Sequence, residues 1–205
     1  MAPEAPYNMS FTAGGLWYRE SVEFARLYLT LKDWQDVRRR ALGDNLIQAR
    51  TASTSVRICR EICQRLAQLN LEELQILSDG STQEQRQILW LAICRRHRFI
   101  YDFAVEVIRE KYLHMSLDLT YEDYDVYFNA KAEWHDELEK LTVKTRSKIR
   151  QVLFRILRET DLLTKGNTIN SAMLTQRVAK TVGKYCRDDL AIFPASEAEI
   201  RELLQ

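Results

Sequence analysis

Apolar residues recur at every third or fourth position along most of this 205-residue chain, which is the spacing of α-helices with one buried face. Few residues interrupt the pattern, since the chain has only 6 glycines and 3 prolines. Residues 1–15 are expected to form an arm. The segment 81–113 is expected to be either one long helix or two helices joined near 95–98. The pattern predicts helices over about 16–31, 34–43, 54–69, 71–79, 81–113, 142–158 and 174–187, with two more that begin near Thr120 and Ser196.

The helix expected over 142–158 is the most telling part of the chain. Apolar positions 149, 152, 153, 156 and 157 form one buried stripe. The segment 142–158 contains no acidic residue, and the next one in the chain is Glu159. The segments 162–164 and 168–169 flank Lys165-Gly166-Asn167, where Gly and Asn tolerate a positive φ. A cationic helix followed by a small hairpin predicts a winged helix, a shape typical of nucleic-acid binding. The alternative is an ordinary amphipathic helix that its Lys and Arg keep soluble.

A second basic surface is expected before residue 70. A helix from Asp33, a turn through Asn45 and a helix from Ser53 resemble a helix-turn-helix, although the turn is longer than usual. Arginines 38–40 end the first of these helices, and Arg57 and Arg60 lie on the outward face of the second. Hydroxyl groups at the start of that helix could donate to phosphates. The alternative is a packing unit of helices with a solvated basic face.

Charge divides the chain into two parts. Between Asp118 and Glu139 there are eight acidic residues against Lys131 alone, whereas 35–65 holds seven arginines against three acidic residues. The change near 114–120 predicts a domain boundary, with an N-terminal helical domain over 1–115 and a C-terminal winged-helix-like domain over 116–205. The expected fold class is therefore mainly α. It combines an N-terminal helical bundle that has a helix-turn-helix-like part with a C-terminal winged-helix-like domain that has a small β-hairpin.

The composition is ordinary for a soluble protein, with 46% apolar residues, 29% charged residues and a net charge of +1. Electrostatic function must therefore come from the segregation of charge. The longest apolar run, 88–94, is far shorter than the roughly 20 residues of a membrane helix. Met1 to Ser10 does not have the pattern of a secretory signal, and Cys59 and Cys63 lie one helical turn apart. We expect buried thiols in a cytoplasmic protein that is not integral to a membrane.

Catalytic and metal-binding patterns are weak. Cys59-x-x-x-Cys63 has neither the spacing of a zinc ribbon nor histidines nearby to complete four ligands. Gly14-Gly15 lacks the lysine and the preceding strand of a phosphate-binding loop. We therefore expect no enzymatic activity, cofactor, metal or small-molecule substrate.

Two further clusters are expected to be structural. The basic run 95–98 could bind phosphates, but Asp102 and Glu106 on the following turn are suitable ion-pair partners. The aromatic residues 121, 124, 127 and 128 could stack on bases, yet the acidic residues beside them repel phosphate. A core or protein-interface role is favoured for this stripe.

The first 70 residues carry a series of spaced motifs. They are Phe11-Thr12-Ala13-Gly14-Gly15-Leu16, then Asp33-Trp34-x-x-Val37, then Asp44-Asn45-Leu46-x-x-Ala49-Arg50-x-x-Ser53-Thr54-x-x-Arg57-Ile58-x-x-Glu61-Ile62-x-x-Arg65-Leu66. In these motifs and in its length, the chain resembles the BrxA family, a small component of BREX bacteriophage-defence systems that is sometimes labelled a putative inner-membrane protein. The hydropathy of this chain contradicts that membrane label.

The resemblance implies an all-helical fold similar to that of the helical antitermination factor NusB, with a helix-turn-helix-like part. It also implies a non-enzymatic, DNA-binding role beside the other BREX components, which are possible partners.

We therefore expect binding to double-stranded DNA, mostly through its phosphates and with little reading of bases. One alternative is a protein-interaction scaffold, in which the acidic, Tyr-rich helix docks a basic partner. RNA binding is another, suggested only by the fold analogy. Arg146 and Arg150 lie beside the apolar stripe and could instead fix the contact between the domains. The residues expected to contact nucleic acid are Arg38, Arg39, Arg40, Arg50, Arg57, Arg60, Lys144, Lys148, Arg155 and Lys165.

Overall fold

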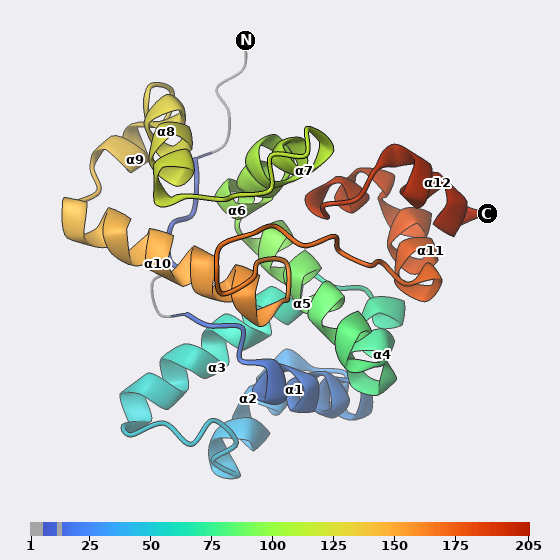
Figure 1. Ribbon diagram of the computed structural model, residues 1–205. Coiled ribbons are helices and arrows are strands. Elements are labelled where there is room, and N and C mark those ends of the chain that lie inside the picture. Colours follow the sequence, from blue (N-terminus) through green and yellow to red (C-terminus); the bar gives the residue numbers. More distant parts are fainter. Residues whose placement is uncertain (1–5, 12–13) are drawn as a thin grey trace.

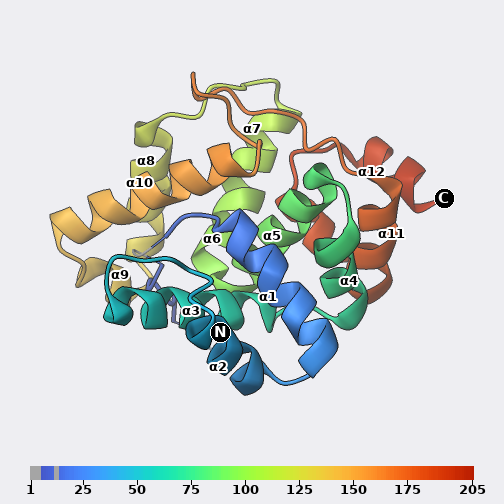
Figure 2. The same cartoon turned by 90° about the horizontal axis from the view of Figure 1, so that it is seen from below.

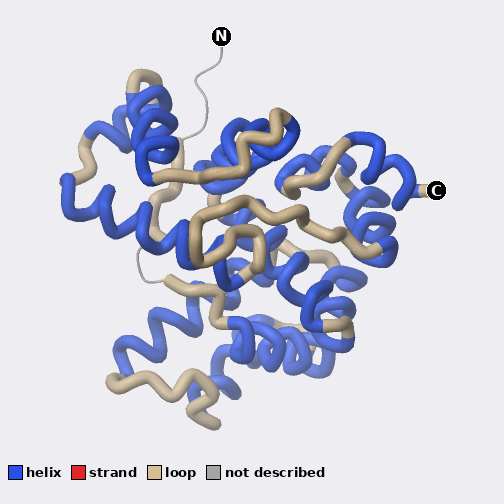
Figure 3. The backbone as a smooth tube through the Cα atoms, viewed as in Figure 1, coloured by secondary structure: helices blue, strands red, loops and turns tan. Residues whose placement is uncertain are grey.

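The computed structural model describes residues 6–11 and 14–205, and this part of the chain is built almost entirely of helices (Figure 1, Figure 3). The mainly α fold class is therefore confirmed. In chain order the elements are α1 (Tyr18–Leu31), α2 (Trp34–Gly43), α3 (Ala52–Leu66), α4 (Leu71–Asp79), α5 (Thr82–Arg96), α6 (Arg98–Phe103), the π-helical η1 (Ala104–Arg109), α7 (Glu110–Leu113), α8 (Tyr121–Ala132), α9 (Asp136–Glu139), α10 (Val143–Glu159), α11 (Gln176–Tyr185), the 3-10 helix η2 (Arg187–Ile192) and α12 (Glu197–Leu204).

Helix α5 lies at the centre of the fold and contacts α1, α3, α4, α6, α11 and η2 (Figure 1, Figure 2). Residues 87–94 of this helix are all buried, because a helix that is apolar all round is stable only where neighbours cover every side. The apolar run 88–94 is therefore a core helix. None of the helices in the described part of the chain combines the length and the hydropathy that crossing a bilayer requires.

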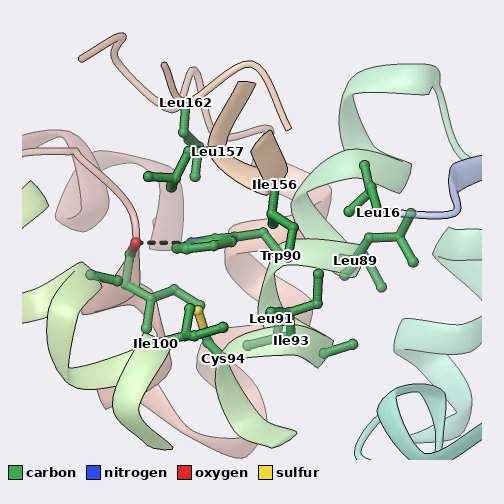
Figure 4. Packing of buried hydrophobic residues seen from close by; sticks show 14 of the residues in the cluster. Leu16, Leu89, Trp90, Leu91, Ile93, Cys94, Ile100, Ile156, Leu157 and Leu162 are labelled. Atoms are coloured by element: carbon green, nitrogen blue, oxygen red, sulfur yellow. Dashed lines mark hydrogen bonds between the residues drawn. The ribbon is translucent and has the colours of Figure 1, made fainter. Parts of the chain in front are cut away.

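The side chain of Trp90 anchors this core. It is fully buried, and its indole Nε1 donates a hydrogen bond of 3.0 Å to the carbonyl oxygen of Ile192, which ties α5 to η2 (Figure 4). Ile156 and Leu157 of α10 lie near the indole in the same view. Buried residues from both sides of the expected boundary at 115/116 belong to one continuous cluster. The division into two domains is not confirmed and stays a prediction.

Most of the helix starts expected from the sequence are confirmed by their capping bonds, whereas the helix expected from Ser53 or Thr54 is capped two residues earlier, by Thr51. The side chains of Asp33, Thr120 and Thr142 each accept a hydrogen bond from a backbone N–H in the first turn of the helix that follows. These bonds satisfy donors that a helix leaves unpaired at its N-terminus. Complete capping boxes form at Asn70–Glu73, Ser81–Glu84 and Ser196–Glu199. The predicted break of the 81–113 segment is also present, because α5 ends before His97.

The winged helix and its β-hairpin are not confirmed. The described residues contain no strand, only the isolated antiparallel bridges Asp118–Thr168 and Leu163–Ile169. Thr164 closes a tight turn, since its N–H donates to the carbonyl oxygen of Thr168 at 2.9 Å. Leu162 and Leu163 are both buried, so this segment does not alternate between a buried and a solvated face as a strand of a small hairpin must. The segment is a core-packed loop.

The helix-turn-helix is likewise not confirmed. Helices α2 and α3 pack against each other, but residues 44–51 separate them. A helix-turn-helix joins its helices through only about three to four residues. The two helices are part of the N-terminal packing unit formed with α1.

Residues 6–11 and 14–17, here called the N-terminal strap, are packed into the molecule and are not an arm. Residues 1–5 and 12–13, where the rest of the expected arm falls, lie outside the described residues. The hydroxyl of Tyr7 donates to Asp102 at 2.9 Å, and its backbone N–H donates to Glu137 at 2.6 Å. The N–H of Leu16 donates to the carboxylate of Glu159. The strap thus ties α6, α9 and α10 together.

A buried polar cluster holds the strap from the other side. Glu61 of α3 lies 3.0 Å from Nε2 of His97 and accepts a bond of 2.9 Å from Nε of Arg65. The guanidinium of Arg65 also donates to the carbonyl oxygen of Gly15 at 2.9 Å. Nδ1 of His97 lies 3.4 Å from the carbonyl oxygen of Asn8. Buried polar groups must be paired to be tolerated, so this cluster fixes the path of the strap between α3 and α5.

The cluster shifts the acid–base equilibria of its members. Burial alone would raise the pKa of Glu61, but the hydrogen bonds and positive charges of His97 and Arg65 outweigh it and lower the pKa from 4.5 to about 2. Burial lowers the pKa of the His97 imidazole. Both groups therefore make folding less favourable at acid pH, because the unfolded chain binds protons that the folded protein does not.

We expect Trp90→Ala to lower the free energy of unfolding by about 3–5 kcal/mol, because it removes a large buried side chain and leaves a cavity. Urea denaturation followed by circular dichroism measures the change. Trp134→Ala is the matched control, since the Trp134 residue is 83% exposed, and we expect it to change the free energy by less than about 0.5 kcal/mol. Equal losses in the two variants would contradict the packing described.

We expect Glu61→Gln to cost about 3–5 kcal/mol at neutral pH, because it leaves Arg65 buried without its counter-charge. The carboxylate's contribution is present above the ordinary pKa of 4.5 and disappears as the pH falls toward about 2. As the pH falls from 4.5 to about 2, the free energy of unfolding should therefore decrease less in the variant than in the unsubstituted protein. Denaturation at a series of pH values measures this difference. Glu23→Gln removes an exposed ion pair and should cost under about 1 kcal/mol. A parallel pH profile in Glu61→Gln would refute this account.

Candidate nucleic-acid interface

Helix α10 buries the apolar stripe that its sequence predicts. Ile149, Val152, Leu153, Ile156 and Leu157 are all inaccessible to solvent. Phe154 is also buried, outside the predicted stripe, and its ring meets that of Tyr121 edge-on with centroids 4.7 Å apart. The stripe therefore covers a broader arc of the helix than expected, and α10 is held firmly against the core.

Two of the basic residues on α10 serve to hold α8. Arg146 donates to Asp125 at 3.1 Å and to Asn129 at 2.7 Å, and Arg150 forms a second ion pair with Asp125. The guanidinium of Arg146 also lies over the ring of Phe128, 4.4 Å from its centroid. These two arginines therefore fix a contact between α8 and α10, which both lie within residues 116–205, and a contact between the two predicted domains stays a prediction.

The other predicted residues of α10 are left to solvent. Lys144, Lys148 and Arg155 are exposed, and none of them forms an ion pair with a described residue. Lys165, in the turn after α10, is also exposed and unpaired within the described part of the chain. Arg158 differs, because it donates to Asn167 at 2.6 Å and so braces that turn. The basic helix is thus divided into residues that hold the fold and residues that face water.

The predicted residues near α2 and α3 are divided in the same way. Arg39 pairs with Asp36 at 2.9 Å and Arg40 with Asp44 at 2.6 Å, so these two charges are locally compensated. The remaining predicted residues of this region are exposed and form no ion pair with any residue that the structure describes; they are Arg38, Arg50, Arg57 and Arg60. Helices α3 and α10 lie on the same side of the molecule with the strap between them (Figure 1, Figure 2).

The structural roles expected for two other clusters are supported by their contacts. Arg95 is held by Glu73 through two hydrogen bonds of 2.7 and 2.9 Å and by Asp189 at 2.8 Å. Arg98 pairs with Asp102 at 2.8 Å, as predicted. The aromatic stripe on α8 is mostly core, because Tyr124, Tyr127 and Phe128 are buried, and it offers no open platform for base stacking.

Three of the four cysteines are buried, as expected for structural thiols. Cys59, Cys63 and Cys94 are free and buried, and Cys186 is free and exposed. Burial raises the pKa of the Cys94 thiol. Within the described residues, no group of three or more His, Cys, Asp or Glu is arranged to hold a metal ion.

One grouping of charges could not be read from the sequence. Arg155 of α10 lines a cavity of about 480 Å³ together with Arg19 of α1 and Arg86 of α5. These three arginines are far apart along the chain, and each lies on a helix whose periodicity gives no sign of the others. Only the packing of α1, α5 and α10 around the strap brings them together.

Comparison with known proteins supports the family resemblance. A protein-family model named BrxA matches residues 5–184. A BREX protein BrxA of Escherichia coli O9:H4 (strain HS) is 27% identical over 146 residues, which are 71% of this chain and 68% of the relative. One of Bacillus cereus (strain H3081.97) is 27% identical over 134 residues, 64% of this chain and 67% of the relative. One of Paramagnetospirillum magneticum (strain ATCC 700264 / AMB-1) is 25% identical and covers 91% of this chain and 92% of its own length.

The fold also has a counterpart among solved structures. The crystal structure of an uncharacterized protein from Magnetospirillum magneticum superposes with a TM-score of 0.79 at 23% identity, over 93% of this chain and all of that chain. At this identity the likeness shows a shared fold and nothing more. Because the family model spans most of the sequence, the chain belongs to the BrxA family.

Proposed function

We propose that this chain is a non-enzymatic component of a BREX phage-defence system and that it binds double-stranded DNA through the phosphate backbone. The proposal of BREX membership rests on the BrxA family and on relatives that are named BREX proteins. Other BREX proteins are accordingly its proposed protein partners. The proposal of DNA binding rests on the basic surface of α10.

The observation that carries DNA binding is the division of charge on α10. The helix uses Arg146 and Arg150 to hold Asp125, yet leaves Lys144, Lys148 and Arg155 exposed and unpaired within the described residues. Basic side chains that no carboxylate neutralises are the ones that can replace the counterions of a phosphate backbone. Lys and Arg that contact phosphates position a duplex without reading its bases, so we expect weak sequence preference.

A protein-interaction scaffold is the second candidate, and exposed apolar side chains near α9 favour it. Trp134 is 83% exposed and Val143 is 86% exposed, at the two ends of the segment that holds α9. An exposed aromatic residue of this kind is typical of a protein-binding surface. The acidic, Tyr-rich helix is a poorer docking surface than its sequence indicates, because most of its aromatic side chains are in the core.

We expect Lys144→Glu combined with Lys148→Glu to weaken binding to unrelated duplexes and to lower the salt dependence of affinity, by about 0.9 in the logarithmic slope for each phosphate that the variant no longer neutralises. Fluorescence anisotropy with a labelled random duplex across a salt series measures both. Lys180→Glu combined with Arg201→Glu on α11 and α12 is the matched control, since both residues are exposed and the net charge changes equally. Arg57→Glu combined with Arg60→Glu tests the basic residues of α3 separately.

Unchanged affinity of the Lys144→Glu and Lys148→Glu variant, with its circular dichroism intact, would remove α10 from the interface. Competition by structured RNA at lower concentrations than duplex DNA would replace the proposed ligand with RNA. The scaffold would be favoured by two results together. This protein would bind no nucleic acid, and its pull-down of other BREX proteins would survive nuclease treatment.

A further inference from the structure

The cavity lined by Arg155 lies where three helices and the N-terminal strap meet. It has a volume of about 480 Å³, and arginines from three helices line it: Arg19 from α1, Arg86 from α5 and Arg155 from α10. Arg19 and Arg155 are exposed and form no ion pair within the described part of the chain, whereas Arg86 pairs with Asp161. Two guanidinium groups that form no ion pair with a described residue therefore line one hollow of the surface.

The backbone at this cavity belongs to the strap and to the first turn of α1. Gly14, Gly15 and Leu16 line it, and α1 begins there after Trp17. Trp17 has the left-handed backbone conformation, and its side chain makes no capping bond to the first turn of α1. The first N–H groups of a helix point out along its axis and carry partial positive charge, so an uncapped N-terminus favours an anion.

A buried guanidinium packs against two residues that line the cavity, Gly15 and Trp17. The side chain of Arg65 is only 4% exposed, its Nη1 bonds the carbonyl oxygen of Gly15, and its plane lies over the Trp17 ring at 4.7 Å from the centroid. Its Nη2 has no hydrogen-bond partner among the described residues and lies 3.4 Å from the position that a β-carbon on Gly14 would take. This buried, unpartnered donor lies beside Gly14, which lines the cavity, whereas Arg65 is not itself a lining residue.

Two carboxylates oppose anion binding and set its strength. Glu20 and Glu159 line the same cavity. One oxygen of Glu159 is already held by the N–H of Leu16, while Glu20 forms no ion pair with a described residue. These two carboxylates lie beside the two arginines that form no ion pair with a described residue, so they should weaken the site measurably. Removing an arginine should therefore weaken phosphate binding, whereas neutralising a carboxylate should strengthen it.

We propose that this cavity binds a phosphate group. The identity of that phosphate as part of a DNA backbone rests on the function proposed above. Arg155 follows Lys148 by seven residues, which places both on one face of α10, so a backbone that runs along this face reaches the cavity. Arg19 and Arg155 supply the charge-assisted hydrogen bonds.

Titration of the intact protein with inorganic phosphate tests the site directly, because Trp17 lines the cavity and reports on it by fluorescence. We expect a saturable change of emission at constant ionic strength that disappears in Trp17→Phe. Arg19→Ala and Arg155→Ala should each weaken phosphate binding by about 3–10-fold, and Glu20→Gln should strengthen it by a similar factor. Arg201→Ala, an exposed residue on α12, should leave it unchanged.

The absence of a saturable change, or equal phosphate affinity in Arg155→Ala and the unsubstituted protein, would overturn the proposal. Thermal unfolding of each variant verifies that it is folded. Duplex binding by Arg19→Ala then identifies the source of the phosphate. A parallel loss of duplex affinity supports a backbone phosphate, whereas unchanged affinity shows that the site binds free phosphate or another phosphorylated ligand. Duplex binding that depends on Lys144 and Lys148, without phosphate binding, would reject the cavity and keep the proposed function.

Discussion

The buried contact of Glu61 with Arg65 and His97 is the constraint on which the rest of the structure depends. It places a carboxylate, a guanidinium and an imidazole out of water, where each requires partners, and the strap provides two of them through the carbonyl oxygens of Asn8 and Gly15. A strap held in this way can reach Glu159 of α10. The N-terminal helices and α10 are therefore joined by a segment that precedes both in the chain.

The orientation of α10 is fixed by its own contacts with the core and with α8. Its apolar stripe packs into the core, and Arg146 and Arg150 are held by Asp125 of α8, so the helix cannot turn about its axis to hide its remaining charges. Lys144, Lys148 and Arg155 consequently stay in solvent. A rigid helix whose exposed basic side chains form no ion pair with a described residue suits the proposed binding of a phosphate backbone, since little side-chain packing would have to change.

The sequence predicted the local features of this fold well, because they depend on nearby residues. Helix starts at Asp33, Asn70, Ser81 and Thr142 follow from side chains that cap their own first turn. The wing was not confirmed, because the turn chemistry of Lys165-Gly166-Asn167 does not determine whether the flanking residues face a core. The packed strap and the three arginines of the cavity could not be predicted, because they depend on contacts between residues far apart in the chain.

The most direct test of this account is the affinity of the unsubstituted protein for a labelled random duplex of roughly 30 base pairs, measured by fluorescence anisotropy from about 50 to 200 mM salt. We predict binding at low salt that weakens steeply and linearly on logarithmic axes as the salt rises, with similar affinity for unrelated sequences. No binding at the lowest salt, or an affinity that salt does not change, would contradict the claim that the exposed charges of α10 meet phosphates.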